Sequence, residues 1–251
     1  MTIVEIDGSI LEGGGQLMRI AIGLSALLKK GIRIKNIRAG RSKPGLKAQH
    51  MCGLRLVQNL AGGRLEDCVL HSTEITYIPE ENAKNSTFRE NFEVDIGTNG
   101  ATTLLSQIAL PVALFRPCPT TLDLIGGTNN ADTAPPVDYY QHIFLHHLKH
   151  FGIETECHIL KRSFNYPKGG GHLQLKIKPM RKALPPISLL AFDRKTCEIS
   201  YDIYACTSGK VSPQVAKQIA SSASNVLRNY IEATEKDSER EGQQQRVYMI
   251  G

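Results

Sequence analysis

The residues best suited to chemistry lie in two glycine-containing stretches near the start of the chain. The first reads Glu12-Gly-Gly-Gly-Gln16 and is followed by Arg19. The second runs from residue 38 to residue 50 and carries four cations, namely Arg38, Arg41, Lys43 and Lys47. Glycine lets backbone N–H groups approach a ligand closely, and cations bind phosphate through charge-assisted hydrogen bonds. The two stretches predict a phosphate site, with the Glu12 carboxylate left for a metal or a proton.

Each stretch also has a plainer interpretation. The glycine run lacks the Lys-Ser/Thr of a P-loop and the spacing of a dinucleotide fingerprint, so it also fits a tight turn between a strand and a helix. The basic stretch also fits a solvated loop, although its glycine and proline residues favour a fixed one. His50, next to Gln49, would stabilise charge or move a proton near a phosphate, or it is a surface or capping histidine.

Further along the chain, the glycine-rich turns carry little charge. They lie at residues 97–103, 126–139 and 166–172, and Gln107 follows the first of them. Their amide and hydroxyl groups suit a sugar or a base, whereas arginines suit phosphates. Four histidines, at positions 142, 146, 147 and 150, have the spacing of one helix face. Without an acidic third ligand, that face is more typical of a helix surface than of a metal site.

These residues are positioned by a unit that occurs twice, with a period of about 90 residues. Apolar–polar alternation predicts strands, and 3.6-residue spacing predicts helices. The first copy has strands at 2–7, 31–38, 64–70 and 74–79 and helices at 13–29 and 45–61. The second has strands at 91–97, 120–126, 153–162 and 171–178 and helices at 100–115 and 136–150. Each copy is therefore β-α-β-α-β-β, an α+β arrangement with the helices on one face of a sheet, because each helix has one apolar stripe to bury.

A third part follows a proline-rich segment. Three prolines between residues 179 and 186 indicate a linker, and a strand at 198–205 and a helix at 212–234 come after it. This part is too small to bury a core alone. Residues 235–251 are polar, and we expect an extended helix end or disorder there. The predicted domains are 1–90, 91–180 and 181–251, the last being a linker with an incomplete domain.

Composition narrows the class of protein. The 251 residues carry a net charge of +6, which favours a polyanionic partner, whereas the absence of Trp argues against a stacking platform for single-stranded bases. The six cysteines form no C-x-x-C pair, so we expect reduced thiols in a nuclear or cytoplasmic protein. The first residues do not look like a signal peptide, and no apolar stretch reaches membrane-spanning length, so we expect neither secretion nor membrane association.

In order along the chain, these motifs resemble those of the RNA 3′-terminal phosphate cyclase family. The resemblance covers residues 1 to about 230. It rests on Asp7-Gly8-Ser9, the stretch 12–16 with Arg19, the stretch 38–50, Gly126-Gly-Thr-Asn129, Ala134-Pro135 and Tyr166-Pro-Lys-Gly-Gly-Gly171. It implies repeated β-α-β-α-β-β units with a smaller inserted α/β domain that begins near residue 185, in a fold related to that of enolpyruvyl transferases.

The resemblance also implies a reaction. A histidine attacks ATP and becomes adenylylated, AMP passes to an RNA 3′-phosphate to give RNA-ppA, and the ribose 2′-hydroxyl closes a 2′,3′-cyclic phosphate. A divalent metal, Mg or Mn, assists, and the partners are ATP and RNA 3′-phosphate ends. The matching residues imply Glu12 as the metal ligand, and Gln107 and Pro135 as nucleotide-binding residues. They imply contacts to phosphate or the RNA end from Arg19, Arg38, Arg41, Gln49 and His50.

One departure from the family concerns the nucleophile. Its adenylylated histidine lies in a His-x-x-Thr motif of a third repeat, and no histidine follows residue 206 here. We therefore expect a fragment, isoform or gene-model product that is inactive alone and able to self-associate through exposed repeat faces. Two other classes stay open. A non-catalytic cyclase-like factor of ribosome biogenesis tends to lose the basic signature that is intact here. An enolpyruvyl transferase shares the repeat but not the motifs.

Overall fold

The structure is a computed structural model that describes residues 3–10, 14–80, 89–129, 134–164, 170–186, 199–207, 210–240 and 247–249. The chain divides into two units, Met1–Pro185 and Pro186–Gly251. The first unit contains all of the duplicated sequence and is described first. Within it, the predicted boundary near residue 90 stays a prediction, as does the one near residue 180.

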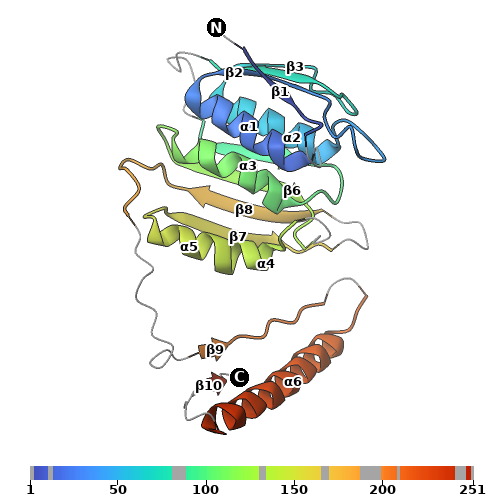
Figure 1. Ribbon diagram of the computed structural model, residues 1–251, viewed down its shortest axis with the longest axis vertical. Coiled ribbons are helices and arrows are strands. Elements are labelled where there is room, and N and C mark those ends of the chain that lie inside the picture. The colour runs from blue at the N-terminus through green and yellow to red at the C-terminus, as the bar shows by residue number, and fades with distance from the viewer. Residues whose placement is uncertain are drawn as a thin grey trace. The chain divides into compact units, whose positions relative to one another are not determined.

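The first unit contains two four-stranded sheets with the same strand order (Figure 1). The first copy consists of β1 (Ile3–Asp7), α1 (Gly15–Leu28), β2 (Gly31–Lys35), α2 (Ala48–Ala61), β3 (Arg64–Glu66) and β4 (Ile75–Ile78). The second consists of β5 (Asn91–Asp95), α3 (Thr102–Leu114), β6 (Thr120–Gly126), the helical segment α4–η2–α5 (Val137–Tyr139, Tyr140–Phe144 and Leu145–His150), β7 (Thr155–Lys161) and β8 (Gly171–Ile177). The predicted α+β duplication is confirmed.

Strand pairing is equivalent in the two copies. The sheet orders are β1-β2-β4-β3 and β5-β6-β8-β7, and in each the first two strands are parallel while the remaining pairs are antiparallel. Side chains alternate along β6 and β8 so that Leu122, Leu124, Leu173 and Leu175 are fully buried on one face. This period of two places the helices of each copy on one face of its own sheet.

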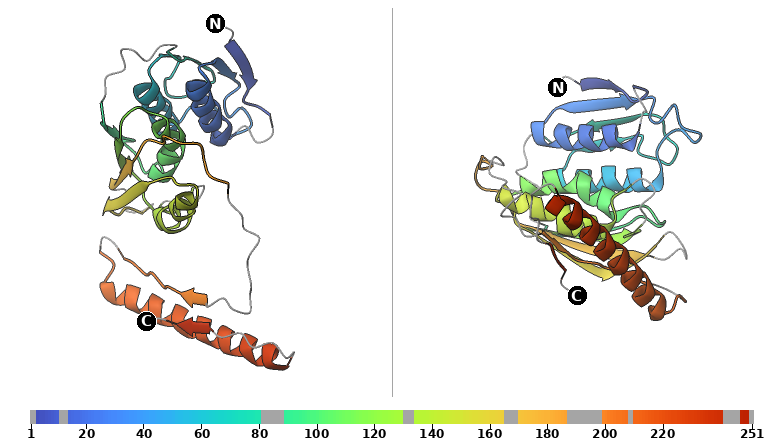
Figure 2. Two further views of the ribbon diagram at one scale, coloured as in Figure 1. Left: turned by 90° about the vertical axis from the view of Figure 1, so that its left-hand side faces the viewer. Right: turned by 60° about the horizontal axis from the view of Figure 1, so that its bottom comes forward.

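The two helical layers face each other between the sheets (Figure 2, left). Helix α3 packs against α1 and α2 of the first copy while it also contacts β6 and β8 of its own sheet. Burial on all sides explains why α3 is apolar almost throughout, with Leu105, Ile108 and Ala109 all buried. One continuous core therefore joins the copies, and the loops at the ends of the helices are held together.

Three local features differ from the sequence expectations. The strand predicted at 64–70 ends at Glu66, because Asp67 adopts a left-handed backbone with φ 57°. The helix predicted at 45–61 begins only at Ala48, because Gly45 has φ 77° and Lys47 is extended. The helix predicted at 136–150 contains a π-helical stretch, Tyr140–Phe144, a local register change that hydrophobic periodicity does not reveal.

The second unit contains α6 (Pro213–Arg240) and two short parallel strands, β9 (Ile199–Tyr201) and β10 (Val247–Met249). The helix continues to Arg240, which agrees with the extended helix end expected after residue 234, whereas residues 247–249 form a strand that the sequence did not predict. Strand β10 forms because it pairs with β9, whose register partners lie 48 residues earlier, and the local composition does not indicate such a partner. No helix in the described part of the chain is long and apolar enough to cross a membrane.

Candidate functional site

The predicted site residues of the first copy lie around the N-terminus of α1. Gly14 is the N-cap residue, with an extended backbone and no side-chain cap. A Cβ atom at Gly15 would lie 2.6 Å from His50 Nε2 and 3.1 Å from Arg19 Nη1, and one at Gly14 would lie 3.9 Å from Arg41 Nη2. Glycine at position 15 therefore lets the imidazole approach the first turn of α1. A helix N-terminus next to two arginines is an electropositive site suited to an anion.

His50 acts there as a neutral hydrogen-bond donor. Its Nδ1 atom accepts a hydrogen bond from the backbone N–H of Lys47, at 3.1 Å, so its proton is assigned to Nε2, which faces Gly15. Burial, and then the charges of Arg38, Arg19 and Lys47, lower the pKa of His50 to about 4. The imidazole is consequently uncharged at pH 7 and offers an N–H group rather than a cation.

Arg38 shapes the loop that carries the other cations. Its Nη1 atom donates to the backbone carbonyls of Lys43 and Gly45, both at 2.8 Å, and the residue is only 8% exposed. Arg41 and Lys43, by contrast, have exposed side chains. The structure thus ties the Arg38 guanidinium to the basic loop itself. Its predicted contact with phosphate or RNA stays a prediction.

Gln49 connects the two copies. Its Oε1 atom accepts a hydrogen bond from the backbone N–H of Ala101, at 3.1 Å, and Ala101 is the N-cap residue of α3. A Cβ atom at the preceding Gly100 would lie 2.9 Å from Gln49 Cβ, so glycine is needed for this close approach. Gln49 therefore fixes the start of α3 beside the start of α2, where it brings the glycine-rich turns of both copies together.

The two predicted nucleotide residues line the same cavity. This cavity has a volume of 130 Å³ and is bounded by Thr103, Gln107, Pro135, Tyr139, Tyr140 and Phe144. Thr103 Oγ1 donates to the Pro135 carbonyl at 2.9 Å, which fixes the proline against α3. An amide, a hydroxyl and aromatic rings in one small cavity suit the polar edge and the apolar faces of a base.

The cavity and the cation site are directly connected. Arg19 Nε donates to Gln107 Oε1 at 3.2 Å, and both residues also line a neighbouring groove of 270 Å³ between α1 and α3. Phe144 borders both spaces. Arg19 thus lies between the α1 N-terminus on one side and Gln107 on the other. A ligand with a base and a phosphate could contact both sites at once.

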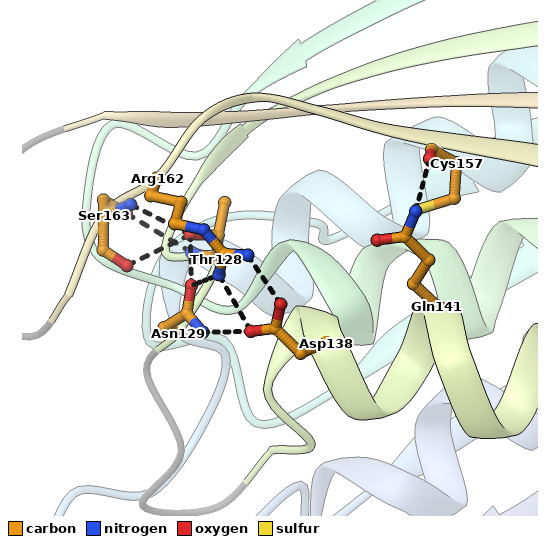
Figure 3. A network of polar contacts seen from close by, with 7 residues as sticks. All are labelled: Thr128, Asn129, Asp138, Gln141, Cys157, Arg162 and Ser163. Carbon is orange, nitrogen blue, oxygen red and sulfur yellow. Dashed lines mark hydrogen bonds and ion pairs between the residues drawn. The ribbon is translucent and has the colours of Figure 1, made fainter. Parts of the chain in front are cut away.

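A polar network behind this cavity was missed by sequence reasoning (Figure 3). Arg162 donates to both carboxylate oxygens of Asp138, at 2.8 and 2.6 Å, and Asn129 Nδ2 donates to the same carboxylate at 2.9 Å. Hydrogen bonds from Arg162 and Asn129 lower the pKa of Asp138 to about 2. Asn129 and Asp138 lie in the glycine-rich turn noted above, but nothing in the sequence pairs them with Arg162.

The predicted metal ligand Glu12 lies outside the described residues, as do Tyr166, Pro167, Lys168 and Gly169. Among the residues that are described, no group of three or more His, Cys, Asp or Glu side chains could hold a metal ion. The rings of His146, His147 and His150 contact one another, with centroids 5.7–5.9 Å apart, but they do not form such a group. The predicted metal site at Glu12 stays a prediction.

Comparison with known proteins gives a consistent match. The family described as RNA 3′-terminal phosphate cyclase matches residues 10–235. A protein of that name from Staphylothermus marinus is 36% identical over 229 residues, which is 91% of this chain and 61% of the relative. The Archaeoglobus fulgidus protein of the same name is 45% identical over 177 residues, or 70% and 52% of the two chains. The Drosophila melanogaster protein is 41% identical over 192 residues, or 76% and 51%.

The chain spans about half to three fifths of the length of these curated relatives. All of the site residues described above fall within the matched range 10–235. The match therefore covers the duplicated unit with its site and continues into the second unit.

Proposed function

The chain belongs to the RNA 3′-terminal phosphate cyclase family, and from this we propose that its duplicated unit binds ATP and an RNA 3′-phosphate end for cyclisation. The observation that carries the proposal is the position of Arg19, which lies by Gly15 and His50 and hydrogen-bonds to Gln107. Arg19 consequently links a phosphate site to the base-sized cavity that Gln107 lines, and a nucleotide and a terminal phosphate must lie this close when they react with each other.

Phosphate binds at the N-terminus of α1 in this proposal. The backbone N–H groups of the first turn, the guanidinium groups of Arg19 and Arg41 and the neutral Nε2–H of His50 all supply donors there. The base enters the cavity between Gln107 and Pro135. Cations on one side and neutral amide and hydroxyl groups on the other orient the nucleotide with its phosphates toward α1.

The proposed reaction has three steps. A histidine attacks the α-phosphorus of ATP and expels diphosphate, AMP passes to an oxygen of the RNA 3′-phosphate, and the 2′-hydroxyl attacks the 3′-phosphorus and expels AMP. Adenylylation supplies the leaving group that a phosphate monoester lacks. We assign only binding and orientation of the two substrates to the residues described here. No step is assigned to a metal, because its predicted ligand Glu12 lies outside the described residues.

RNA end preference tests this function directly. We expect the chain to bind an oligoribonucleotide with a 3′-phosphate at least about tenfold more tightly than the same RNA with a 3′-hydroxyl, because the phosphate adds charge-assisted hydrogen bonds. Arg41→Gln should weaken binding of the phosphorylated RNA and leave binding of the hydroxyl end nearly unchanged. Fluorescence anisotropy with end-labelled RNA at fixed salt measures both affinities.

Arg64→Gln is the matched control, since it removes the same charge from an exposed arginine at the start of β3. Position 64 follows the C-terminus of α2, and a 14-residue helix places it about 21 Å from the end that carries His50. Equal binding of the two RNA ends by the unmodified chain would contradict the proposed function. If Arg41→Gln and Arg64→Gln lost the same affinity for the phosphorylated RNA, the loss would reflect net charge and not a specific contact from Arg41.

A further inference from the structure

One wall of the nucleotide cavity is held from outside the cavity. Pro135, Tyr139, Tyr140 and Phe144 come from the segment that leads into α4 and continues through η2. Helix α4 is the first turn of the continuous helical segment Val137–His150, and its N-cap residue Pro136 makes no side-chain cap. Contacts with other elements therefore determine how this first turn lies against the second sheet.

Asp138 makes those contacts at the first turn. Its carboxylate accepts two hydrogen bonds from Arg162, just beyond the end of β7, and one from Asn129, just beyond the end of β6. Figure 3 shows the three side chains converging at the start of α4. Both oxygens of the carboxylate are thus bound by side chains of the second sheet's strand ends. The first turn of α4 cannot shift relative to the end of β7 without breaking this bidentate pair.

The strand ends on which Asp138 rests are themselves tied together. Thr128 Oγ1 accepts from the backbone N–H of Ser163 at 2.9 Å, and Ser163 Oγ donates to the Gly126 carbonyl at 2.9 Å. Ser163 is buried, as is Thr128. The Asp138 carboxylate is therefore attached to a rigid, buried frame rather than to two mobile loops.

We propose that the Asp138–Arg162 ion pair, with Asn129, positions the Pro135–Tyr139 wall of the nucleotide cavity and thereby controls how tightly the chain binds ATP. Neither Asp138 nor Arg162 lines the cavity. They are positioning residues, because they act through Pro135 and Tyr139. The inference rests on the proposed function only in naming ATP as the ligand.

The test combines nucleotide affinity with local hydrogen exchange. In Asp138→Asn and in Arg162→Met, we expect the ATP affinity to fall about tenfold and amide exchange in residues 137–145 to become about tenfold faster. Arg162→Lys keeps the charge but not the bidentate geometry. Its ATP affinity and its amide exchange should therefore lie between those of the unmodified chain and those of Arg162→Met. Binding of RNA with a 3′-phosphate and exchange in α1 should stay unchanged, which shows that the variants are folded.

Glu154→Gln is the matched control. It makes the same carboxylate-to-amide change in an exposed pair, whose partner Lys178 Nζ lies 2.6 Å from Glu154 Oε2, and it should alter neither value. Unchanged exchange and affinity in both Asp138→Asn and Arg162→Met would overturn the inference. If the unmodified chain bound no ATP, the assignment of the cavity to ATP would fall, whereas the exchange measurement would still decide whether Asp138 positions the wall.

Discussion

At the residue scale, the chemistry open to a side chain in this protein depends on its surroundings in the folded structure. Arg38 and Arg41 look equivalent in the sequence. The first donates to two carbonyls of its own loop, whereas the second has an exposed side chain close to Gly14. His50 is similarly changed by its surroundings, because buried imidazole among cations stays neutral and becomes a fixed donor. Residue type alone reveals neither the partners of Arg38 nor the lowered pKa of His50.

The depressed pKa of His50 makes a prediction about pH. The folded state keeps His50 neutral down to a pKa of about 4, whereas the unfolded chain protonates it near 6.5. Unfolding therefore takes up a proton between these values, and the stability from the neutral imidazole, complete above pH 6.5, is lost as the pH falls toward 4. Relative to His50→Asn, the native chain should lose up to about 3 kcal/mol of its free energy of unfolding between pH 7 and pH 4.

Urea unfolding of both chains across that pH range measures the difference. Asparagine is chosen because its Oδ1 atom can still accept from the Lys47 N–H group while nothing titrates. Above pH 7 the difference should be constant, which serves as an internal control. NMR of the imidazole protons measures the pKa of His50 directly. A value at or above 6.5 would show that burial does not hold the ring neutral.

At the element scale, the helical segment α4–η2–α5 is the least regular part of the duplicated unit and forms one wall of the cavity. Its π-helical stretch places Tyr140 inside, where Tyr140 OH lies 2.5 Å from Ser106 Oγ of α3, and the ring stacks on Phe144 at 5.2 Å. A π-helical turn is an unfavourable register that survives because such contacts fix it. The hydroxyl pair thus ties the wall to α3 just as Asp138 ties it to the sheet.

Removing both members of that pair should cost little more than removing one. Ser106→Ala leaves the buried Tyr140 hydroxyl without its partner and should lower the free energy of unfolding by about 1–3 kcal/mol, and Tyr140→Phe should do likewise. The double variant should cost little more than either single change. Urea unfolding of the four proteins completes the cycle. Additive losses in the double variant would mean that the two hydroxyl groups do not act as a pair.

At the scale of the whole molecule, the two copies share one core while the second unit is thinly packed. Buried residues of α1, α2 and α3 belong to a single cluster that extends into both sheets. In the described part of the second unit, Ile231 is the one buried hydrophobic residue. The copies should therefore unfold together, and the second unit should open more readily. Self-association through the exposed apolar residues of α1, which are Ile20, Leu24 and Leu28, stays a prediction.

Leu105→Ala tests whether the copies share their stability. Leu105 is 1% exposed, and its truncation should cost about 2–5 kcal/mol. Hydrogen exchange should accelerate by the same factor in β2 of the first sheet and β8 of the second. Leu28→Ala is the matched control, because that leucine is 61% exposed and should cost far less. Faster exchange confined to the second sheet would contradict a shared core. In the unmodified chain, α6 should exchange faster than α1.

The sequence by itself determined the duplicated β-α-β-α-β-β order. Alternation along β2 and β8 and helical spacing along α2 are local properties, and each follows from which face a residue must bury. It also placed Gln107 and Pro135 in one group by resemblance, and the structure puts both in one cavity. The end of β3 at Glu66 and the strand β10 depended on a left-handed aspartate and a distant partner, so periodicity did not predict them.

Only the tertiary structure decided which side chains meet. The hydrogen bond from Arg19 to Gln107 spans 88 residues, and the Asp138–Arg162 pair joins a helix start to a strand end 24 residues away. Neither contact has a local signature, because a side chain's partner depends on how the two sheets and the helices of both copies pack. The same packing supplies the burial that neutralises His50 and the carbonyls that bind Arg38. The protonation state of a group and the partners within its hydrogen-bonding distance depend on this packing, so they cannot be predicted from any single stretch of sequence.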